Sequence, residues 1–251
     1  MKKIGILFFK SVAGIVLVNA IWFVAAELLQ LQALVSPLKV YASFPTVLEN
    51  GLSKHLWASL VRLLWGVGTA LFVGFIVALF MVKENHTSKI LDALIYFSYP
   101  IPKLALLPVV MLLAGLGDLT KVIMIFLILV FQITINLRDG LKRIPEESFL
   151  IARSLGSSRW QTFKHVLFPA VLPELLSTLR VAIGTAISVL FVTETYGTDR
   201  GMGYFIVDAW MRINYTEMYA GIVAISVLGF ILFILTDLLE NIFCKWKFVT
   251  Y

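Results

Sequence analysis

Residues 56–82 read LWASLVRLLWGVGTALFVGFIVALFMV, an apolar run with a single charged side chain, Arg62. An α-helix rises about 1.5 Å per residue, so about 20 apolar residues cross a bilayer core that is roughly 30 Å thick. This run is therefore long enough to span a membrane. Five further runs have the same apolar character, and they lie at residues 4–29, 90–116, 122–137, 171–193 and 219–243.

We expect these six spans to be α-helices. Lipid offers no partner for backbone N–H and C=O groups, and only helices and closed barrels satisfy those groups internally. The runs lack the two-residue alternation of barrel strands, so we predict an all-α integral membrane protein with six transmembrane helices. The opening run, residues 4–29, is longer than the core of about 7–15 residues in a secretory signal, and we interpret it as the first span.

The composition excludes several classes of protein. The 251-residue chain is 60% hydrophobic and 14% charged, which is too apolar for a soluble domain. Its net charge of +6 is spread over short segments between the apolar runs, so we expect no nucleic-acid partner. One cysteine, Cys244, and three scattered histidines suggest neither a disulfide framework nor a metal site. We expect no catalytic residues and no enzyme activity.

The Lys and Arg residues between the spans predict the orientation. Six spans place both chain ends on one side, and cytosolic loops carry an excess of Lys and Arg. With the N-terminus inside, the cytosolic segments hold thirteen of these residues and the outer segments hold five: Lys39, Lys54, Lys121, Arg200 and Arg212. We therefore expect a multi-pass protein of the plasma or inner membrane, in contact with lipid, with both termini in the cytosol.

The longest connection on the predicted cytosolic side, residues 138–170, begins with a helix signal. Pro145 followed by the acidic Glu146 and Glu147 is typical of a helix start, because carboxylates are favourable near the positive end of the helix dipole. Gly156 can take the left-handed conformation that ends a helix. The connection is therefore predicted to begin with one short helix that stops at a glycine elbow.

A second short helix is predicted after the elbow. Ser157 or Ser158 caps it, and Pro169 is expected to end it. Its apolar face carries Trp160, Phe163 and Leu167. Two interpretations remain open, an interfacial hairpin that lies on the lipid headgroups or a docking site for a partner.

The spacing of the loop resembles the EAA loop of ATP-binding-cassette (ABC) importer permeases, which docks into a groove on the ATPase. The resemblance rests on Ala152, Gly156, Phe163, Val166, Phe168 and Pro169. Residues 150–152 are Leu-Ile-Ala where the family has Glu-Ala-Ala, so this chain lacks the acidic residue at position 150. Glu146 or Glu147 is then the candidate for the acidic docking contact. Further motifs are similar to permeases for nitrate, sulfonate, taurine and thiamine-precursor pyrimidines, and they lie at residues 55–62, 66, 100–108, 115–117, 121, 173, 179–180, 194–197, 201–204 and 237–239.

The resemblance implies a type I ABC importer permease fold with cytosolic coupling helices. It implies residues 1–54 as an N-terminal span with an outer segment, and residues 55–251 as the permease core with the coupling loop 138–170. The ATPase-coupling residues are then Glu147, Ala152, Gly156, Trp160, Phe163, Val166 and Pro169. The implied partners are two ABC ATPase subunits, a second copy of this permease and an extracytoplasmic solute-binding protein. The sequence has no Gly-x-x-x-x-Gly-Lys-Ser/Thr loop, so we expect no cofactor on this chain and ATP with Mg on the ATPase.

Small residues recur every four positions in the second span. Gly66, Ala70, Gly74 and Ala78 share one helix face, and such faces let helices pack closely in lipid. We predict a helix-packing seam, within the subunit or across a dimer. Incidental small residues in an apolar span are the alternative.

Prolines and charged groups predict a translocation pathway. Pro100, Pro102 and Pro108 break the third span, and a break at membrane depth is tolerated beside protein or a cavity. Alternatively, residues 88–99 lie along the surface and Pro102 begins the span. Charges within spans are costly and are functional by default. Around Glu194 we expect pathway residues, namely Thr193, Glu194, Tyr196 and Gly197. Structural ion pairs are the alternative for Glu194, Arg62, Arg180 and especially Asp237.

The main rival to the importer is a transporter that is driven by an ion gradient. Such carriers usually show inverted repeats with broken helices at matching positions of two halves. Only one break is visible in this sequence. We therefore favour solute import by alternating access, powered by a separate ATPase.

Overall fold

The computed structural model describes residues 2–82 and 85–248, and this part of the chain contains helices and turns but no strand. Among these residues, five helices are long and apolar enough to cross a membrane. They are α1 (Lys2–Leu29), α3 (Leu52–Met81), α6 (Asp118–Lys142), α9 (Phe168–Glu194) and α11 (Tyr215–Phe243). A bent helix pair brings the total to six if it counts as one span. The predicted all-α membrane fold is confirmed.

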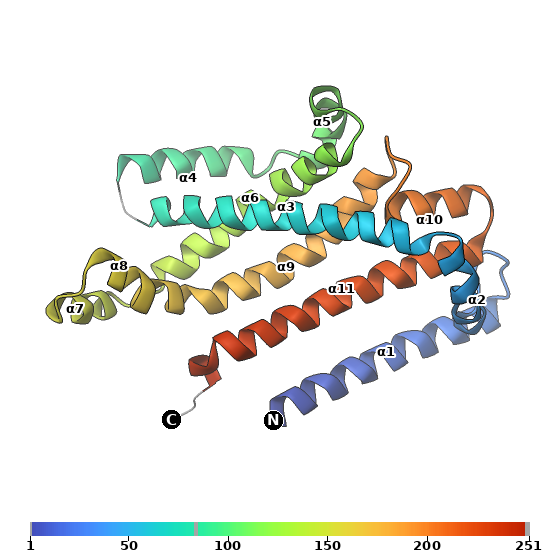
Figure 1. Ribbon diagram of the computed structural model, residues 1–251, viewed down its shortest axis with the longest axis horizontal. Coiled ribbons are helices and arrows are strands. Elements are labelled where there is room, and N and C mark those ends of the chain that lie inside the picture. The colour runs from blue at the N-terminus through green and yellow to red at the C-terminus, as the bar shows by residue number, and fades with distance from the viewer. Residues whose placement is uncertain (1, 83–84, 249–251) are drawn as a thin grey trace.

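Helices α3, α6 and α9 form the centre of the bundle, and their apolar side chains make the main core (Figure 1). The small-residue seam of α3 faces α6. A Cβ atom on Gly66 would lie 2.6 Å from Ile125 Cβ, and one on Gly74 would lie 2.8 Å from Ile133 Cγ2. Ala70 and Ala78 of the same seam are fully buried in the main core. The seam therefore lies within the subunit, where it lets two spans approach closely.

The third predicted span is broken. Helix α4 (His86–Ser98) packs along α3, and a 3₁₀ turn, η1 (Lys103–Leu106), leads into α5 (Leu107–Ala114). The two helical segments are bent by 83°. Figure 1 shows α4 running alongside α3 and α5 projecting away from the bundle. Helix α4 therefore accompanies a span, and this arrangement differs from the alternative in which it lies along the surface.

Two shorter helices cover one end of the bundle, which we call the α10 end. Helix α2 (Pro37–Glu49) and helix α10 (Met202–Met211) pack against α11 and build a second apolar core there (Figure 1). The sequence predicted outer segments in these regions and no helix in them. The predicted domain boundary at residues 54 and 55 falls just inside α3, which begins at Leu52.

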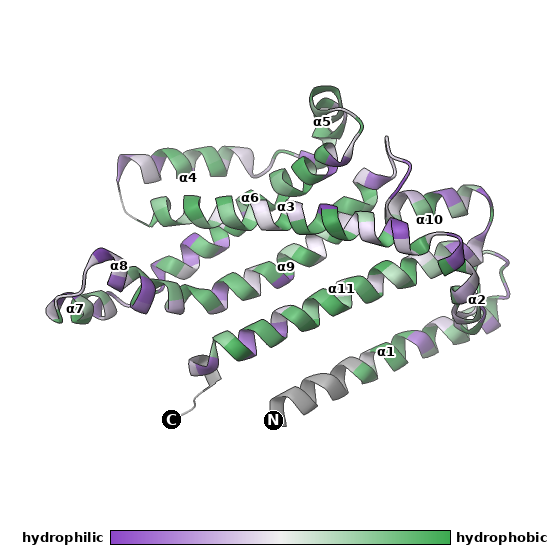
Figure 2. Cartoon of the chain, in the orientation of Figure 1, coloured by the Kyte–Doolittle hydropathy of each residue, from purple (hydrophilic) through white to green (hydrophobic). Residues whose placement is uncertain are grey.

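The opposite end, the α7–α8 end, carries the connection between α6 and α9. It consists of α7 (Glu146–Ser154), α8 (Arg159–Thr162) and a π-helical turn, η2 (Phe163–Leu167). The start of α1, the end of α11 and the final turn η3 (Lys245–Phe248) also point toward this end (Figure 1). Figure 2 shows apolar residues dominating the long helices and polar residues gathering at the bundle ends.

The expectation that Pro169 ends the second short helix is wrong. Pro169 lies in the first turn of α9. The wider π turn directly precedes it, so α8 continues into α9. Residues Arg159–Glu194 form one helical segment of 36 residues.

Candidate functional site

The glycine elbow between α7 and α8 has the predicted conformation. Gly156 has φ +71°, which strains any residue with a Cβ, and the Ser157 amide donates to the Ala152 carbonyl at 3.1 Å. Ser158 caps α8, because its hydroxyl accepts from the Gln161 amide at 3.3 Å. The Gln161 side chain in turn accepts from the Ser158 amide at 2.7 Å. The angle between the two helices is therefore fixed by local hydrogen bonds.

The two helices expose apolar side chains at the α7–α8 end. Ala152 is buried, whereas Leu155 is 80% exposed and Trp160 is 69% exposed. Leu150 and Ile151 are exposed beside them. We call these four exposed residues, Leu150, Ile151, Leu155 and Trp160, the docking surface. An apolar surface on a polar, water-facing end of a membrane protein is typical of a protein interface.

An aromatic chain links α8 to α9 across the π turn. The Trp160 and Phe163 rings stack with centroids 5.5 Å apart, and Phe163 lies 6.1 Å from Phe168. Val166 and Pro169 line a neighbouring cavity of about 690 Å³. Glu147 is exposed at the start of α7. The structure therefore brings the predicted coupling residues together at one end of the bundle.

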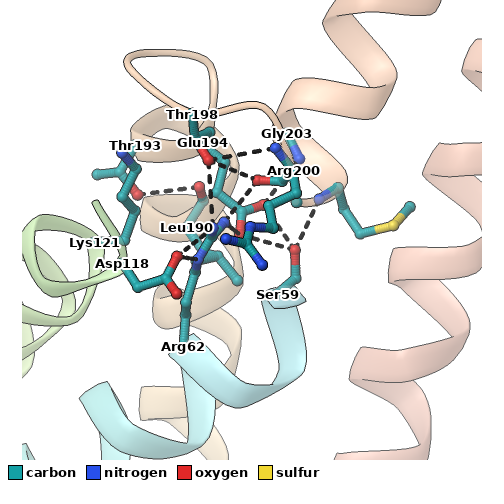
Figure 3. A network of polar contacts seen from close by, with 12 residues as sticks. Ser59, Arg62, Asp118, Lys121, Leu190, Thr193, Glu194, Thr198, Arg200 and Gly203 are labelled. Atoms are coloured by element: carbon teal, nitrogen blue, oxygen red, sulfur yellow. Dashed lines mark hydrogen bonds and ion pairs between the residues drawn. The ribbon is translucent and has the colours of Figure 1, made fainter. Parts of the chain in front are cut away.

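At the α10 end, Arg62 and Glu194 form a buried ion pair (Figure 3). Their side chains are 2% and 0% exposed, and Arg62 Nη1 lies 2.7 Å from Glu194 Oε1. Arg62 also donates to Asp118 at 2.9 and 2.5 Å, to the Arg200 carbonyl at 2.8 Å and to the Thr198 hydroxyl at 3.3 Å. The guanidinium thus finds acceptors on α6, on α9 and on the connection that follows α9.

The Glu194 carboxylate has further partners on other elements. The Ser59 hydroxyl lies 2.9 and 2.7 Å from its two oxygens, and the Gly203 amide donates to Oε2 at 3.0 Å. Ser59 Oγ also accepts from the Met202 amide at 2.8 Å. His55 Nδ1 accepts from the Gly201 amide at 3.2 Å. We call these groups, with Arg62 and Asp118, the buried network.

Glycines make room for the buried network. A Cβ atom on Gly201 would lie 2.5 Å from each Glu194 carboxylate oxygen, and one on Gly203 would lie 2.8 Å from Glu194 Cβ. Lys121, which is fully buried, donates to the Gly197 carbonyl at 3.0 Å. The network therefore fixes both ends of the connection between α9 and α10.

The predicted pathway residues do not form a single cluster. Thr193 and Glu194 are fully buried at the α10 end, whereas Tyr196 is exposed there. Pro100 and Pro102 line two separate cavities beside the break, and Pro108 is exposed on α5. In this conformation Glu194 lies inside the subunit and not on an open surface. Its pathway role stays a prediction.

A second group of charges within the spans is paired. Arg180 on α9 forms ion pairs with Asp237 and Glu240 on α11, the latter at 3.0 Å. This geometry favours the structural interpretation of Asp237. Sequence reasoning missed Ser59, Asp118 and His55 as members of the buried network. One signal was available, because Ser59 precedes Arg62 by three residues, and residues three apart lie on one helix face.

The geometry defines a class of protein: a multi-pass membrane subunit with a fixed network at one end and an apolar docking surface at the other. The comparisons narrow this class. Residues 70–245 match the model of the family described as "Binding-protein-dependent transport system inner membrane component". This match covers more than half of the chain, and the chain belongs to that family. It is a permease subunit of an ABC importer.

The names of individual relatives agree with this family assignment. The chain is 28% identical to the taurine transport system permease protein TauC of Escherichia coli strain K12, over 88% of this chain and 84% of that protein. It is 30% identical to the putative aliphatic sulfonates transport permease protein SsuC of Bacillus subtilis strain 168, over 91% of this chain and 84% of that protein. Among solved structures, the MetNI methionine ABC transporter matches with a TM-score of 0.68 at 17% identity, over 76% of this chain and 95% of that chain.

Proposed function

We propose that two copies of this chain form the membrane pathway of the importer and that two ATPase subunits dock on α7 and α8. ATP and Mg then bind on the ATPase. The observation that carries the proposal is the docking surface itself, in which Leu155 and Trp160 are 80% and 69% exposed although a capping box at Ser158 fixes the start of α8. An extracytoplasmic solute-binding protein then docks at the α10 end, where the exposed Tyr196 and Trp210 lie.

The continuous helix from Arg159 to Glu194 gives the mechanism a mechanical basis. Its 36 residues extend over about 54 Å, from the docking surface to the buried network. When ATP closes the ATPase subunits, movement of α8 passes through the π turn into α9. The Glu194 end of α9 then shifts against α3 and α6, and the pathway opens to the other side. Hydrolysis reverses the movement and releases the solute inward.

The proposed solute is small and comes from outside the cell. The relatives carry the names of taurine, aliphatic sulfonate, nitrate, bicarbonate and formylaminopyrimidine transport proteins. We assign the solute to this group, and a binding protein then supplies most of the selectivity. Membership of the importer family favours an ATP-driven process over the ion-gradient-driven transporter.

Coupling is tested at the glycine elbow. Gly156→Val forces a β-branched residue into φ +71° and reorients α8, so capture of the ATPase by purified permease should be lost. Gly51→Val is the matched control, because Gly51 also has a left-handed φ, +94°, with open space around it, at the other end of the bundle. That variant should retain the ATPase. Equal ATPase capture by both variants contradicts the coupling role.

Orientation is tested by thiol labelling. Cysteines replace Ser158 at the elbow and Asp199 in the connection after α9, in a Cys244→Ser background; Asp199 has an 89% exposed side chain. We expect both termini and Ser158 on the cytosolic side. A membrane-impermeant reagent should therefore label only the Asp199 site in intact cells and both sites after permeabilisation. Labelling of the Ser158 site from outside places the docking surface away from ATP and rejects the mechanism.

A further inference from the structure

The break in the third span contains a cation that no carboxylate balances. Lys103 Nζ donates to the carbonyl oxygens of Ser98 at 3.0 Å, Tyr99 at 3.1 Å and Ile101 at 3.4 Å. These acceptors satisfy its three N–H donors but carry no net charge. Within residues 2–82 and 85–248, no carboxylate forms an ion pair with Lys103. It differs in this respect from Arg62, Arg138 and Arg180, which are all paired.

Lys103 lines a pocket of about 600 Å³ between the break, α6 and α9. Among the described residues that line this pocket, Lys103 alone is charged. Its ammonium also lies 4.8 Å from the centroid of the Phe131 ring, on the pocket wall. Three neutral polar side chains face the same space, Gln132 on α6 and Thr185 and Ser188 on α9. The pocket therefore combines a net charge of +1 with neutral polar side chains from two helices, α6 and α9.

The pocket lies at membrane depth. Gln132 is about 21 Å along α6 from Asp118 and about 15 Å from Lys142. A second cavity of about 750 Å³ continues along the same helix toward the α7–α8 end, and Tyr99 lines both spaces. Arg138 in that second cavity is paired with Asp92 at 2.5 Å. Lipid headgroups lie at the membrane surfaces, whereas the Lys103 pocket lies midway along α6. A transported solute is therefore a better occupant of this pocket than a lipid headgroup.

We propose that the pocket at the break binds a small monovalent oxyanion, of the sulfonate or nitrate kind, with Lys103 as the charged recognition group. The proposal rests on the proposed function, because it names the class of solute that the pathway passes. The carbonyl bonds hold the ammonium in place before the anion arrives. The Gln132 amide supplies donors for anion oxygens. The apolar wall strengthens the attraction by excluding water.

The test measures protection of a cysteine at the pocket. The variant Ser188→Cys, in a Cys244→Ser background, is purified with its ATPase in lipid nanodiscs and treated with the neutral reagent methyl methanethiosulfonate. The probes are methanesulfonate and its neutral isostere dimethyl sulfone. With a dissociation constant of about 1 mM, methanesulfonate at about 10 mM should slow the reaction about tenfold. Dimethyl sulfone should leave the rate unchanged.

Three variants make the test specific. Lys103→Gln should abolish protection, and Lys103→Arg should retain most of it. Ser226→Cys on α11 is the matched control: like Ser188, Ser226 is an exposed serine that bonds the carbonyl four residues earlier. Neither probe should protect it. If Lys103→Gln fails to assemble, the Ser188→Cys parent alone provides the test. Equal effects of methanesulfonate and dimethyl sulfone on its reaction rate then overturn the proposal.

Two further outcomes separate the sources of error. If Ser188→Cys reacts more slowly in phosphatidylglycerol than in phosphatidylcholine nanodiscs without any probe, the occupant is a lipid headgroup and the solute proposal is overturned. The ATPase content of each preparation is measured in parallel. Loss of protection with the ATPase still bound overturns the anion site only, whereas absence of the ATPase from the parent complex contradicts the proposed function.

Discussion

The two ends of helix α9 differ in how they treat polar and apolar groups. At its Glu194 end, charges that are costly in a membrane are fully buried, and each has partners on other elements. At its α8 end, apolar groups that are costly in water are left exposed, with Leu155 at 80% and Trp160 at 69%. The buried network at the first end finds its partners within one chain. In the proposed function the ATPase covers the docking surface at the second end, so the comparison contrasts structural residues with proposed interaction residues.

The largest effect is expected from Arg62→Met. This change removes the cation from between two carboxylates and leaves Glu194 buried without its ion-pair partner. Breaking a buried ion pair on one side costs about 3–5 kcal/mol of unfolding free energy. Arg143→Met is the matched control, because Arg143 is 73% exposed and its contact with Glu174 is 3.9 Å long. Thermal unfolding of the purified protein should show a large loss for Arg62→Met and almost none for the control, and equal losses contradict the comparison.

The membrane fold could be predicted from the sequence because it follows from composition. Long apolar runs such as residues 56–82 must form helices in lipid, whatever their neighbours are. The glycine elbow at Gly156 was predictable for a similar reason, since a left-handed φ is a local property. The buried network was not predictable, because Arg62 and Glu194 are 132 residues apart and only tertiary packing brings them together.

The second prediction concerns the exposed end. Trp160→Ala should weaken ATPase binding by about 30-fold or more, as expected for a tryptophan at the centre of an interface that contributes at least about 2 kcal/mol. Trp57→Ala on α3 is the matched control, because Trp57 is 67% exposed in a different part of the bundle. It should leave ATPase binding unchanged. Binding measured by surface plasmon resonance checks both variants, and an unchanged affinity of Trp160→Ala rejects the docking surface.

The third prediction tests how tightly the buried network is packed around Glu194. Gly203→Ala places a Cβ atom 2.8 Å from Glu194 Cβ and against the Phe191 carbonyl, so overpacking should cost about 1–3 kcal/mol. Gly68→Ala, with nothing within 4 Å, should be neutral or slightly stabilising, by up to about 1 kcal/mol. Chemical denaturation compares the two. Similar stabilities of the two variants show that the connection after α9 adapts freely.

Two elements show where sequence reasoning stopped short. The π turn at residues 163–167 accommodates Pro169 within a continuing helix. The proline that was expected to end a short helix therefore lies at the start of a span. Helix α2 begins at Pro37 and contains Pro45, and its Val40 and Val47 join the second apolar core with residues of α10 and α11. In both cases tertiary contacts outweigh the local preference of proline.

The smallest effect is expected where the same ion-pair chemistry is exposed to water. Arg212, directly after α10, and Asp208 on α10 pair at 2.9 Å, with side chains 50% and 39% exposed. The hydrogen bond to Asp208, aided by Glu217, raises the pKa of Arg212. A raised pKa gives a contribution to the free energy of unfolding that is complete below the pKa of Arg212 in the unfolded chain. This contribution is lost only as the pH rises through the pKa in the folded protein, in strongly alkaline solution.

Asp208→Asn should therefore cost less than about 0.5 kcal/mol at any neutral pH, and salt should reduce even that cost, because water and ions screen the pair. Unfolding of Asp208→Asn and Arg62→Met, followed at low and high salt, compares one chemistry in two environments. If Asp208→Asn proves as costly as Arg62→Met, burial is not what distinguishes the two pairs.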